Sequence, residues 1–239
     1  MNLINNDDYF NTIPKGILGE IYIKSKCIWD MLKVKDTYLK KLEYKNFGKT
    51  DKTVIISNNC YIGSNTIIEP YCVIEGSVYI GKNCYIRPHS YIRAGTIIGD
   101  NVTVGHGVEV KNSIIFDECK LDSHSFVGDS IFGLGVRNGS GTITANRRFD
   151  QKDISISFNG DKIDTNLDKF GCIIGEYSRL GANCTTAPGV CIERHTWIYP
   201  NTFINESVKS NTLVKLRQKI ESEEKEKSFL TRYDKHQQI

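Results

Sequence analysis

Residues 56–104 read ISNNCYIGSNTIIEPYCVIEGSVYIGKNCYIRPHSYIRAGTIIGDNVTV, and an apolar residue returns in this stretch at every sixth position. The series continues past the stretch and comprises Ile56, Ile62, Ile68, Ile74, Ile80, Ile86, Ile92, Ile98, Val104, Val110 and Phe116. A helix with 3.6 residues per turn loses a six-residue register within two repeats, so the period excludes a helix. A short strand followed by a tight corner fits the period, and three such units close one triangular coil, with the residues of the series, Phe116 included, pointing into its interior.

Small residues and glycines mark the corners of the expected coils. A small or branched residue stands four positions after most of the aliphatic ones, and Cys72, Cys84 and Cys184 read as small buried residues of this kind. Glycine and asparagine tolerate the positive φ that such corners require. We therefore predict an all-β fold, a left-handed parallel β-helix of hexapeptide repeats over residues 51–214. The competing architecture is a right-handed β-helix, whose coils are longer and less regular.

The repeat is interrupted in its second half. The register breaks between Phe116 and Phe132, and the polar residues Asn138 and Thr144 then take inward positions before a second clean run from Ile174 to Ile204. Residues 147–172 leave the repeat, and ISISFNGDKI within them predicts a β-hairpin that turns at 159–160. An excursion of this length from a solenoid predicts a lid or a partner contact, or else a tolerated surface insertion.

The two ends do not follow the repeat. Residues 1–50 predict an amphipathic helical cap or linker. Its expected buried residues are Ile21, Ile23, Ile28, Met31 and Leu32. Residues 215–239 predict a short, charged helical tail. The chain shows no apolar stretch of transmembrane length and no signal-peptide pattern, so a cytoplasmic protein is expected. Its net charge of +3 is too small to indicate nucleic-acid binding.

Several motifs are more specific than the repeat itself. They are VEVKNSII at 108–115, VGDS at 127–130, GSGTITAN at 139–146 and KIDTNLDKFGCIIGE at 162–176. With these motifs the chain resembles the acetyltransferase half of bifunctional N-acetylglucosamine-1-phosphate uridylyltransferase/glucosamine-1-phosphate acetyltransferases and related sugar-phosphate nucleotidyltransferases. The resemblance covers roughly residues 55–215. Residues 1–50 do not resemble the nucleotidyltransferase half, because they lack its glycine-rich loop.

The resemblance implies an acyltransferase of nucleotide-sugar and cell-envelope biosynthesis. It implies the transfer of acetyl from acetyl-CoA to the amine of a hexosamine 1-phosphate, without a metal. Hexapeptide acyltransferases form trimers, so a homotrimer is expected, and a separate nucleotidyltransferase is a possible partner. No nucleic acid or membrane is expected as a partner.

Two cations are best suited to hold the substrate phosphate. Arg93 and Lys111 are 18 residues apart, so they are expected to stack on one face one coil apart. The resemblance assigns this pair to the sugar phosphate, where arginine supplies a bidentate contact and lysine a point charge. Arg87 is a weaker candidate for the same role.

The expected general base departs from the family pattern. The family has a histidine six residues before the Asp of the GD motif, where this chain has Ser123, and His124 follows. Either a strained turn at 122–125 aims His124 into the site, where histidine suits proton transfer near neutral pH, or the chain lacks the usual base. The resemblance also assigns the sugar contacts. They are Phe126 in place of a tyrosine, Arg137 in place of an asparagine, and Asn146.

The acetyl donor is expected near the later coils. The resemblance assigns the backbone N–H of Ser140 to the oxyanion, which a donor at this place would stabilise. It assigns the binding of coenzyme A to Ala182, Tyr199, Lys215 and Arg217.

Two other functions compete with acetyl transfer. One is a non-catalytic scaffold or regulatory β-helix that pairs with a separate nucleotidyltransferase. The other is a zinc protein similar to γ-class carbonic anhydrases, because His89, His106 and His124 are spaced to lie on neighbouring coils.

Overall fold

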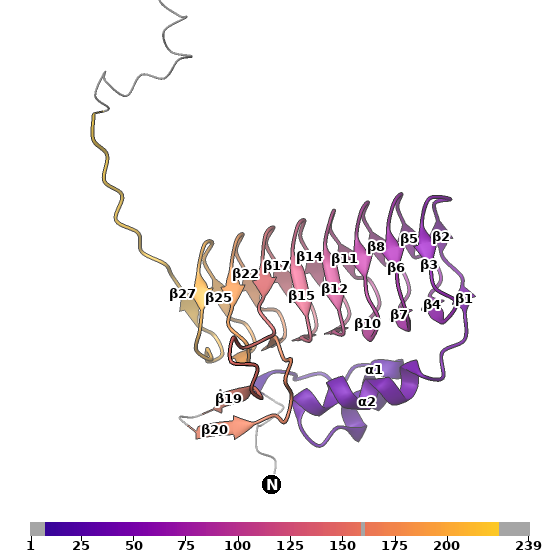
Figure 1. The fold of residues 1–239 in the computed structure, drawn as a ribbon, viewed down its shortest axis with the longest axis horizontal. Coiled ribbons are helices and arrows are strands. Elements are labelled where there is room, and N and C mark those ends of the chain that lie inside the picture. Colours follow the sequence, from indigo (N-terminus) through magenta and orange to yellow (C-terminus); the bar gives the residue numbers. More distant parts are fainter. Residues whose placement is uncertain (1–7, 159–160, 225–239) are drawn as a thin grey trace, which may run out of the picture.

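The computed structural model describes residues 8–158 and 161–224, and its main body is a left-handed parallel β-helix (Figure 1). Successive short strands enter three parallel sheets in turn, which we name sheets A, B and C. The BC corner leads from a strand of sheet B to the next strand of sheet C, and the CA corner leads from sheet C to sheet A. The predicted fold class is confirmed.

Each sheet is a ladder with one strand from each coil. In the described part of the chain, sheet A comprises β1 (Lys45–Asn46), β4 (Cys60–Ile62), β7 (Val78–Ile80), β10 (Thr96–Ile98), β13 (Ile114–Ile115), β16 (Ile131–Phe132), β21 (Cys172–Ile174) and β24 (Val190–Ile192). Sheet B comprises β2 (Lys49–Thr50), β5 (Ile67–Ile68), β8 (Tyr85–Ile86), β11 (Thr103–Val104), β14 (Lys120–Leu121), β17 (Arg137–Asn138), β22 (Arg179–Leu180), β25 (Trp197–Ile198) and β27 (Leu213–Val214). Sheet C comprises β3 (Ile55–Ile56), β6 (Val73–Ile74), β9 (Tyr91–Ile92), β12 (Glu109–Lys111), β15 (Phe126–Gly128), β18 (Ile143–Thr144), β23 (Thr185–Thr186) and β26 (Phe203–Ile204).

The predicted aliphatic series fills the interior of the β-helix. Ile80 and Ile98 are completely buried, and so is Ile174 at the start of the second run. Cysteines take the small position next to a corner, where the Cys84 thiol donates a hydrogen bond to the carbonyl of Gly99 at 3.0 Å. Burial raises the pKa of this thiol to about 11, so the group is a packing residue rather than a nucleophile.

Two CA corners are one residue shorter than those of the earlier coils, and they shift the register. Ile80 pairs with Ile98, a step of 18 residues, whereas Ile98 pairs with Ile115, a step of 17. The next step, from Ile115 to Phe132, is again 17 residues. The chain therefore loses one residue at 111–114 and another at 128–131. The sequence had indicated a single break of the register between 116 and 132. The first of the two short corners therefore lies earlier in the chain than predicted.

The first short corner changes which residue faces the core. Ile115 lies in the interior cluster, while Phe116 belongs to a second cluster outside the β-helix. The prediction that Phe116 points inward was therefore wrong. Its ring is buried instead against Phe10, with the two ring centroids 5.0 Å apart.

The N-terminal helices lie along the outside of sheet A (Figure 1). They are α1 (Gly16–Lys24), the 3₁₀ helix η2 (Ile28–Asp30) and α2 (Met31–Leu39). Ile97, Ile114 and Ile131 form an apolar column on the outer face of sheet A, and the helices bury it. The helices thus cover a side of the β-helix, where a cap or a linker had been expected. The expected inward residues are buried except Ile23, which is 71 % exposed.

The outer cluster predicts a large stability effect at Phe116. Phe116→Ala is expected to lower the free energy of unfolding by about 3 kcal/mol, because it leaves a cavity beside Phe10 in the outer cluster. Phe149→Ala is the matched control, since Phe149 is fully exposed, and it should change stability by less than about 0.5 kcal/mol. Urea unfolding followed by circular dichroism measures both. Equal losses in the two variants would contradict the packing described.

The excursion at 147–172 is docked on the same side as the helices. β19 (Ser155–Phe158) and β20 (Asp161–Asp164) pair as an antiparallel hairpin, as predicted, and the expected turn at 159–160 lies outside the described residues. Ile154, Ile156 and Phe170 are buried in the outer cluster. The segment is therefore held by packing at both of its ends.

The charged tail differs from its prediction where it is described. Residues 215–224 form neither helix nor strand and are exposed. They offer few apolar side chains for packing, and most helical stability in proteins comes from such packing. Residues 225–239 lie outside the described range. Among the described residues there is no helix of a length and hydropathy that would span a membrane.

Candidate active site

The outer face of sheet C carries the two cations predicted to hold a phosphate. The pairing of β9 with β12 places Arg93 and Lys111 on adjacent coils, as their spacing predicted. Each has an acidic partner. Arg93 Nη1 lies 2.8 Å from Glu109 Oε1, and Lys111 Nζ lies 3.3 Å from Asp129 Oδ2. Arg93 is more than one-third exposed, so its ion pair is weak and open to exchange for a ligand.

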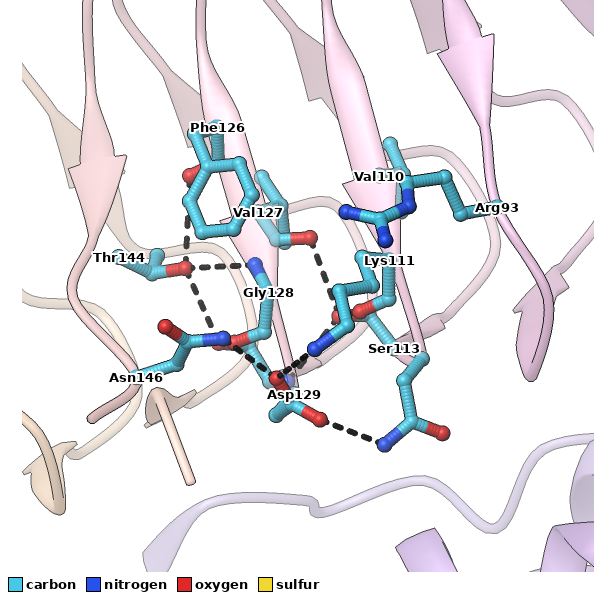
Figure 2. Close-up of polar contacts among 12 residues, drawn as sticks. Arg93, Val110, Lys111, Ser113, Phe126, Val127, Gly128, Asp129, Thr144 and Asn146 are labelled. Carbon is cyan, nitrogen blue, oxygen red and sulfur yellow. Dashed lines mark hydrogen bonds and ion pairs between the residues drawn. The ribbon is translucent and has the colours of Figure 1, made fainter. Parts of the chain in front are cut away.

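Asp129 is the centre of a polar network at the CA corners (Figure 2). Its side chain is only 3 % exposed and accepts hydrogen bonds from Asn112 Nδ2 at 2.6 Å, from Asn146 Nδ2 and from Lys111. Asn112 and Asp129 both have positive φ, of 48° and 49°, which short polar residues tolerate. The two short corners are therefore what brings this network together.

Polar groups inside the β-helix support the network next to Asp129 (Figure 2). Thr144 Oγ1 accepts a hydrogen bond from the N–H of Gly128 at 2.9 Å and lies 3.2 Å from Ser130 Oγ. Asn138 is buried as well and donates to Ser125 Oγ at 2.9 Å. Both polar residues that were predicted to face inward do so. They fix the strand β15, which ends at the Asp129 corner.

His124 lies at the opposite edge of sheet C, in a BC corner of ordinary length. Its φ is 58°, the conformation that His89 and Gly107 adopt at the same place in earlier coils. The predicted strained turn at 122–125 is thus a regular corner. His124 is exposed and its ring meets His106 edge-on, with centroids 5.1 Å apart. Gly107 leaves room for this ring, because a Cβ there would lie 3.0 Å from Nδ1.

The BC corner continues from His124 toward the residues expected to bind the acetyl donor. The N–H of Gly141 donates to the carbonyl of Ser123, so Ser140 and Gly141 lie one coil beyond His124. The N–H of Asn183 donates to the carbonyl of Ser140, which places Ala182 one coil further. Ser140, Ala182 and His124 are therefore aligned along one edge.

Tyr199 and Lys215 lie together near the end of this edge. The Lys215 ammonium is 5.6 Å from the centroid of the Tyr199 ring, a cation–π contact between two exposed side chains. Arg217 follows in the exposed segment beyond β27. The structure thus gathers three of the four residues expected to bind coenzyme A on one edge of the molecule.

The structure separates Arg87 and Arg137 from the phosphate pair. Arg87 is exposed and lies 5.3 Å from the centroid of the Tyr85 ring of sheet B. Arg137 is on sheet B as well, paired with Lys120 and Arg179. These two arginines therefore face away from the sheet C surface.

Sheet C is hollowed next to Asn146. A groove of about 610 Å³ runs between the start of the excursion and the later coils. It is lined by Ala145, Arg147, Arg148, Phe149, Asp150, Ile154, Ser155, Ala187, Pro188 and Phe203. The sequence offered no signal for this groove, since it depends on how the excursion folds back.

The three histidines considered for zinc form a ladder along the BC corner. The centroids of His89 and His106 are 5.4 Å apart, and the planes of each successive pair are nearly perpendicular. Within residues 8–158 and 161–224, no group of three or more His, Cys, Asp or Glu side chains is arranged to hold a metal ion. The geometry of these histidines therefore gives no support to the carbonic anhydrase alternative.

Sequence reasoning missed three residues of the network. Asp129 belongs to the VGDS motif, but it served only to locate the position of the family's histidine. Asn112 follows Lys111 and carried no separate signal. Lys35 comes from α2, where it donates to Asn112 Oδ1 at 2.6 Å, and its distance in sequence hid the contact.

Comparisons with known proteins agree with one another. A family profile described as the GMPPB C-terminal domain matches residues 74–214. The chain is 39 % identical over 186 residues to the bifunctional protein GlmU of Methanococcus maripaludis (strain DSM 14266), covering 78 % of this chain and 45 % of that protein. It is 36 % identical to an uncharacterized acetyltransferase, YaiX, of Escherichia coli K12, covering 77 % of this chain and 80 % of that one. The chain spans less than half the length of the bifunctional relatives.

A solved structure of a UDP-N-acetylglucosamine acyltransferase from Francisella novicida is also similar. It shares 15 % identity and a TM-score of 0.39, with 72 % of this chain and 63 % of that chain covered.

Proposed function

The chain belongs to the GMPPB C-terminal domain family, and on that premise we propose that it is an acetyltransferase. Its substrates are acetyl-CoA and the amine of a hexosamine 1-phosphate. The observation that carries the proposal is the layout of sheet C, which has a cationic, hydrogen-bonding network at one edge and an exposed histidine at the other. The names of the relatives, bifunctional GlmU and an acetyltransferase, support the same reaction class.

The phosphate and the amine of such a substrate stand on adjacent carbon atoms, so both lie close together over sheet C. His124 lies four residues before Gly128, the last residue of β15, which is roughly 13 Å of extended chain, so the cations have to reach from the CA side toward the BC corner. Lys111 and Arg93 hold the phosphate through their long side chains, and Asn146 donates to the sugar. The amine then lies toward the BC corner, within reach of His124.

The chemistry at the BC corner is amide formation. The amine nitrogen attacks the thioester carbonyl, His124 accepts its proton, and the carbon–sulfur bond breaks to release coenzyme A, whose thiolate takes up a proton. The N–H of Ser140 donates to the oxyanion of the tetrahedral intermediate. Ala182 and Tyr199 border the donor along the same edge, while Lys215 and Arg217 meet its phosphates.

The assembly we propose is a homotrimer, in which a neighbouring subunit completes the coenzyme A site. Such an arrangement also gives Arg87 and Arg137 a role, because sheet B of one subunit then faces sheet C of the next. A separate sugar nucleotidyltransferase is the proposed functional partner, since the bifunctional relatives extend beyond the part that this chain matches.

Turnover of acetyl-CoA against a panel of amino-sugar 1-phosphates tests the proposal. Release of free thiol is expected with glucosamine 1-phosphate or galactosamine 1-phosphate, and not with N-acetylglucosamine 1-phosphate, which has no free amine. Binding of acetyl-CoA without turnover of any amine would favour the non-catalytic scaffold instead. Absence of both binding and turnover would reject the proposal.

A further inference from the structure

Lys35 breaks the apolar pattern of α2. Met31, Lys35 and Leu39 are spaced by four residues, so they form one stripe that faces the β-helix, and all three are buried. The side chain of Lys35 has no exposed surface. An aliphatic residue would complete the stripe at no electrostatic cost, whereas a buried ammonium is expensive unless it is paired and hydrogen-bonded.

The partners of this ammonium lead to the candidate active site. Lys35 Nζ donates to Asn112 Oδ1 at 2.6 Å and to Asp36 Oδ1 at 3.0 Å. Asn112 in turn donates through Nδ2 to Asp129 Oδ1 at 2.6 Å. One amide therefore joins the buried lysine to the carboxylate that also holds Lys111. Because Oδ1 of Asn112 accepts from Lys35, its Nδ2 is the atom directed at Asp129.

The charges around Asp129 show what Lys35 contributes in addition to Lys111. If Asp129 contacted Lys111 alone, the carboxylate would largely neutralise the charge of Lys111, the residue proposed to bind the phosphate. Burial lowers the pKa of Lys35, while Asp36 and Asp129 raise it, so the charge of Lys35 is felt at Asp129. Asp36 is the direct ion-pair partner of Lys35 and raises its pKa more than Asp129 does, but the Asp36 side chain is 53 % exposed and partly screened by solvent. The Asp129 carboxylate is thus paired directly with Lys111 and coupled to Lys35 through Asn112.

We infer that Lys35 is a positioning residue of the site, which acts through Asn112 on Asp129 and keeps Lys111 available to the phosphate of the substrate. The role in phosphate binding rests on the function proposed above. The coupling of Lys35 to Asp129 and Lys111 does not, so the two parts can be tested separately.

The first test needs no substrate. Lys35→Met preserves length and fits the apolar stripe, so the variant is expected to fold, as circular dichroism will verify. Trace labelling with acetic anhydride, followed by mass spectrometry, should then modify Lys111 about five-fold more slowly than in the wild type, because Asp129 holds it more tightly. Lys120 is exposed and serves as the internal reference. Unchanged or faster labelling of Lys111 would overturn the inference.

Matched variants separate charge from structure. Lys33→Met changes an exposed lysine of the same helix and should leave the labelling of Lys111 unchanged. Lys35→Gln keeps a donor for Asn112 but no charge, so it should reproduce the slower labelling even if Lys35→Met fails to fold. Labelling at the wild-type rate in Lys35→Gln would show that the charge of Lys35 does not act on Lys111.

The second test uses turnover. Lys35→Met is expected to raise KM for glucosamine 1-phosphate about ten-fold, with kcat within about two-fold of the wild type, because phosphate binding and not proton transfer is weakened. A loss confined to kcat would overturn the positioning role. If the wild-type protein acetylates no amino sugar, the proposed function fails, while the labelling result still decides whether Lys35 is coupled to Asp129 and Lys111.

Discussion

Asp129→Asn is expected to lower kcat/KM for the hexosamine 1-phosphate about a hundred-fold and the free energy of unfolding by about 3 kcal/mol. The carboxylate accepts from Lys111, Asn112 and Asn146 and is almost completely buried. A neutral amide at this place leaves Lys111, the residue proposed to hold the phosphate, without its counter-charge and removes a negative charge near the buried Lys35. Its NH₂ group also faces side chains that already donate. Removing one member of a buried charged network costs far more than an exposed pair is worth.

Asparagine makes this a sharp test, because it preserves the size of the side chain and accepts the positive φ of the corner. The matched control is Asp153→Asn, an exposed aspartate in the excursion, for which neither stability nor turnover should change. Steady-state kinetics and urea unfolding measure the two effects. Wild-type KM together with wild-type stability in Asp129→Asn would show that the network is not the anchor of the site.

The fold could be predicted from the sequence because every layer of the core repeats the same signal. One aliphatic residue per strand, such as Ile80 or Ile98, points inward, and a residue that tolerates positive φ stands at the corner. The same reasoning placed Arg93 and Lys111 on adjacent coils. Periodicity fixes the neighbours in a solenoid, because each coil contacts only the coils beside it.

The places where prediction failed are those where the period changes. A corner shortened by one residue leaves the aliphatic pattern of 110–116 nearly intact, since both Ile115 and Phe116 are apolar, and only the pairing of Ile98 with Ile115 distinguishes them. The same shortening creates the corner of Asn112. The Asp129 network therefore arises at the irregularity, which the repeat itself cannot reveal.

Contacts that residues outside the repeat make with the β-helix could not be predicted from the sequence either. Nothing in the pattern of α2 indicates that Lys35 reaches Asn112, 77 residues away. The available signal was the position of Lys35 in an otherwise apolar stripe. This signal becomes informative only once the helix is known to lie on sheet A. An analogous limit applies to the groove beside the excursion, whose lining comes from three separate segments.

The second large effect is expected at His124. His124→Ala should lower kcat about a thousand-fold with little change in KM, because a general base contributes to the transition state and not to the binding of the phosphate. His106→Ala is the matched control. It removes the neighbouring ring of the ladder, 5.1 Å away, and should cost less than about ten-fold, since only the support of His124 is lost. Equal losses in both variants would show that His106 and His124 act together. No loss in His124→Ala would remove this residue from the mechanism.

A second-site variant distinguishes proton transfer from ring stacking at this corner. In the double variant Ser123→His/His124→Ala, the imidazole moves to the position that the resemblance gives to the family's base, and the edge contact that His124 makes with His106 is removed. Recovery of at least about ten-fold in kcat over His124→Ala is expected if the missing group is a proton acceptor, since an imidazole near the amine restores general-base catalysis. No recovery, together with unchanged binding of acetyl-CoA, would mean that the corner holds its base at residue 124 alone. In that case the regular geometry of the corner, with φ of 58° at His124, is itself what directs the imidazole to the substrate.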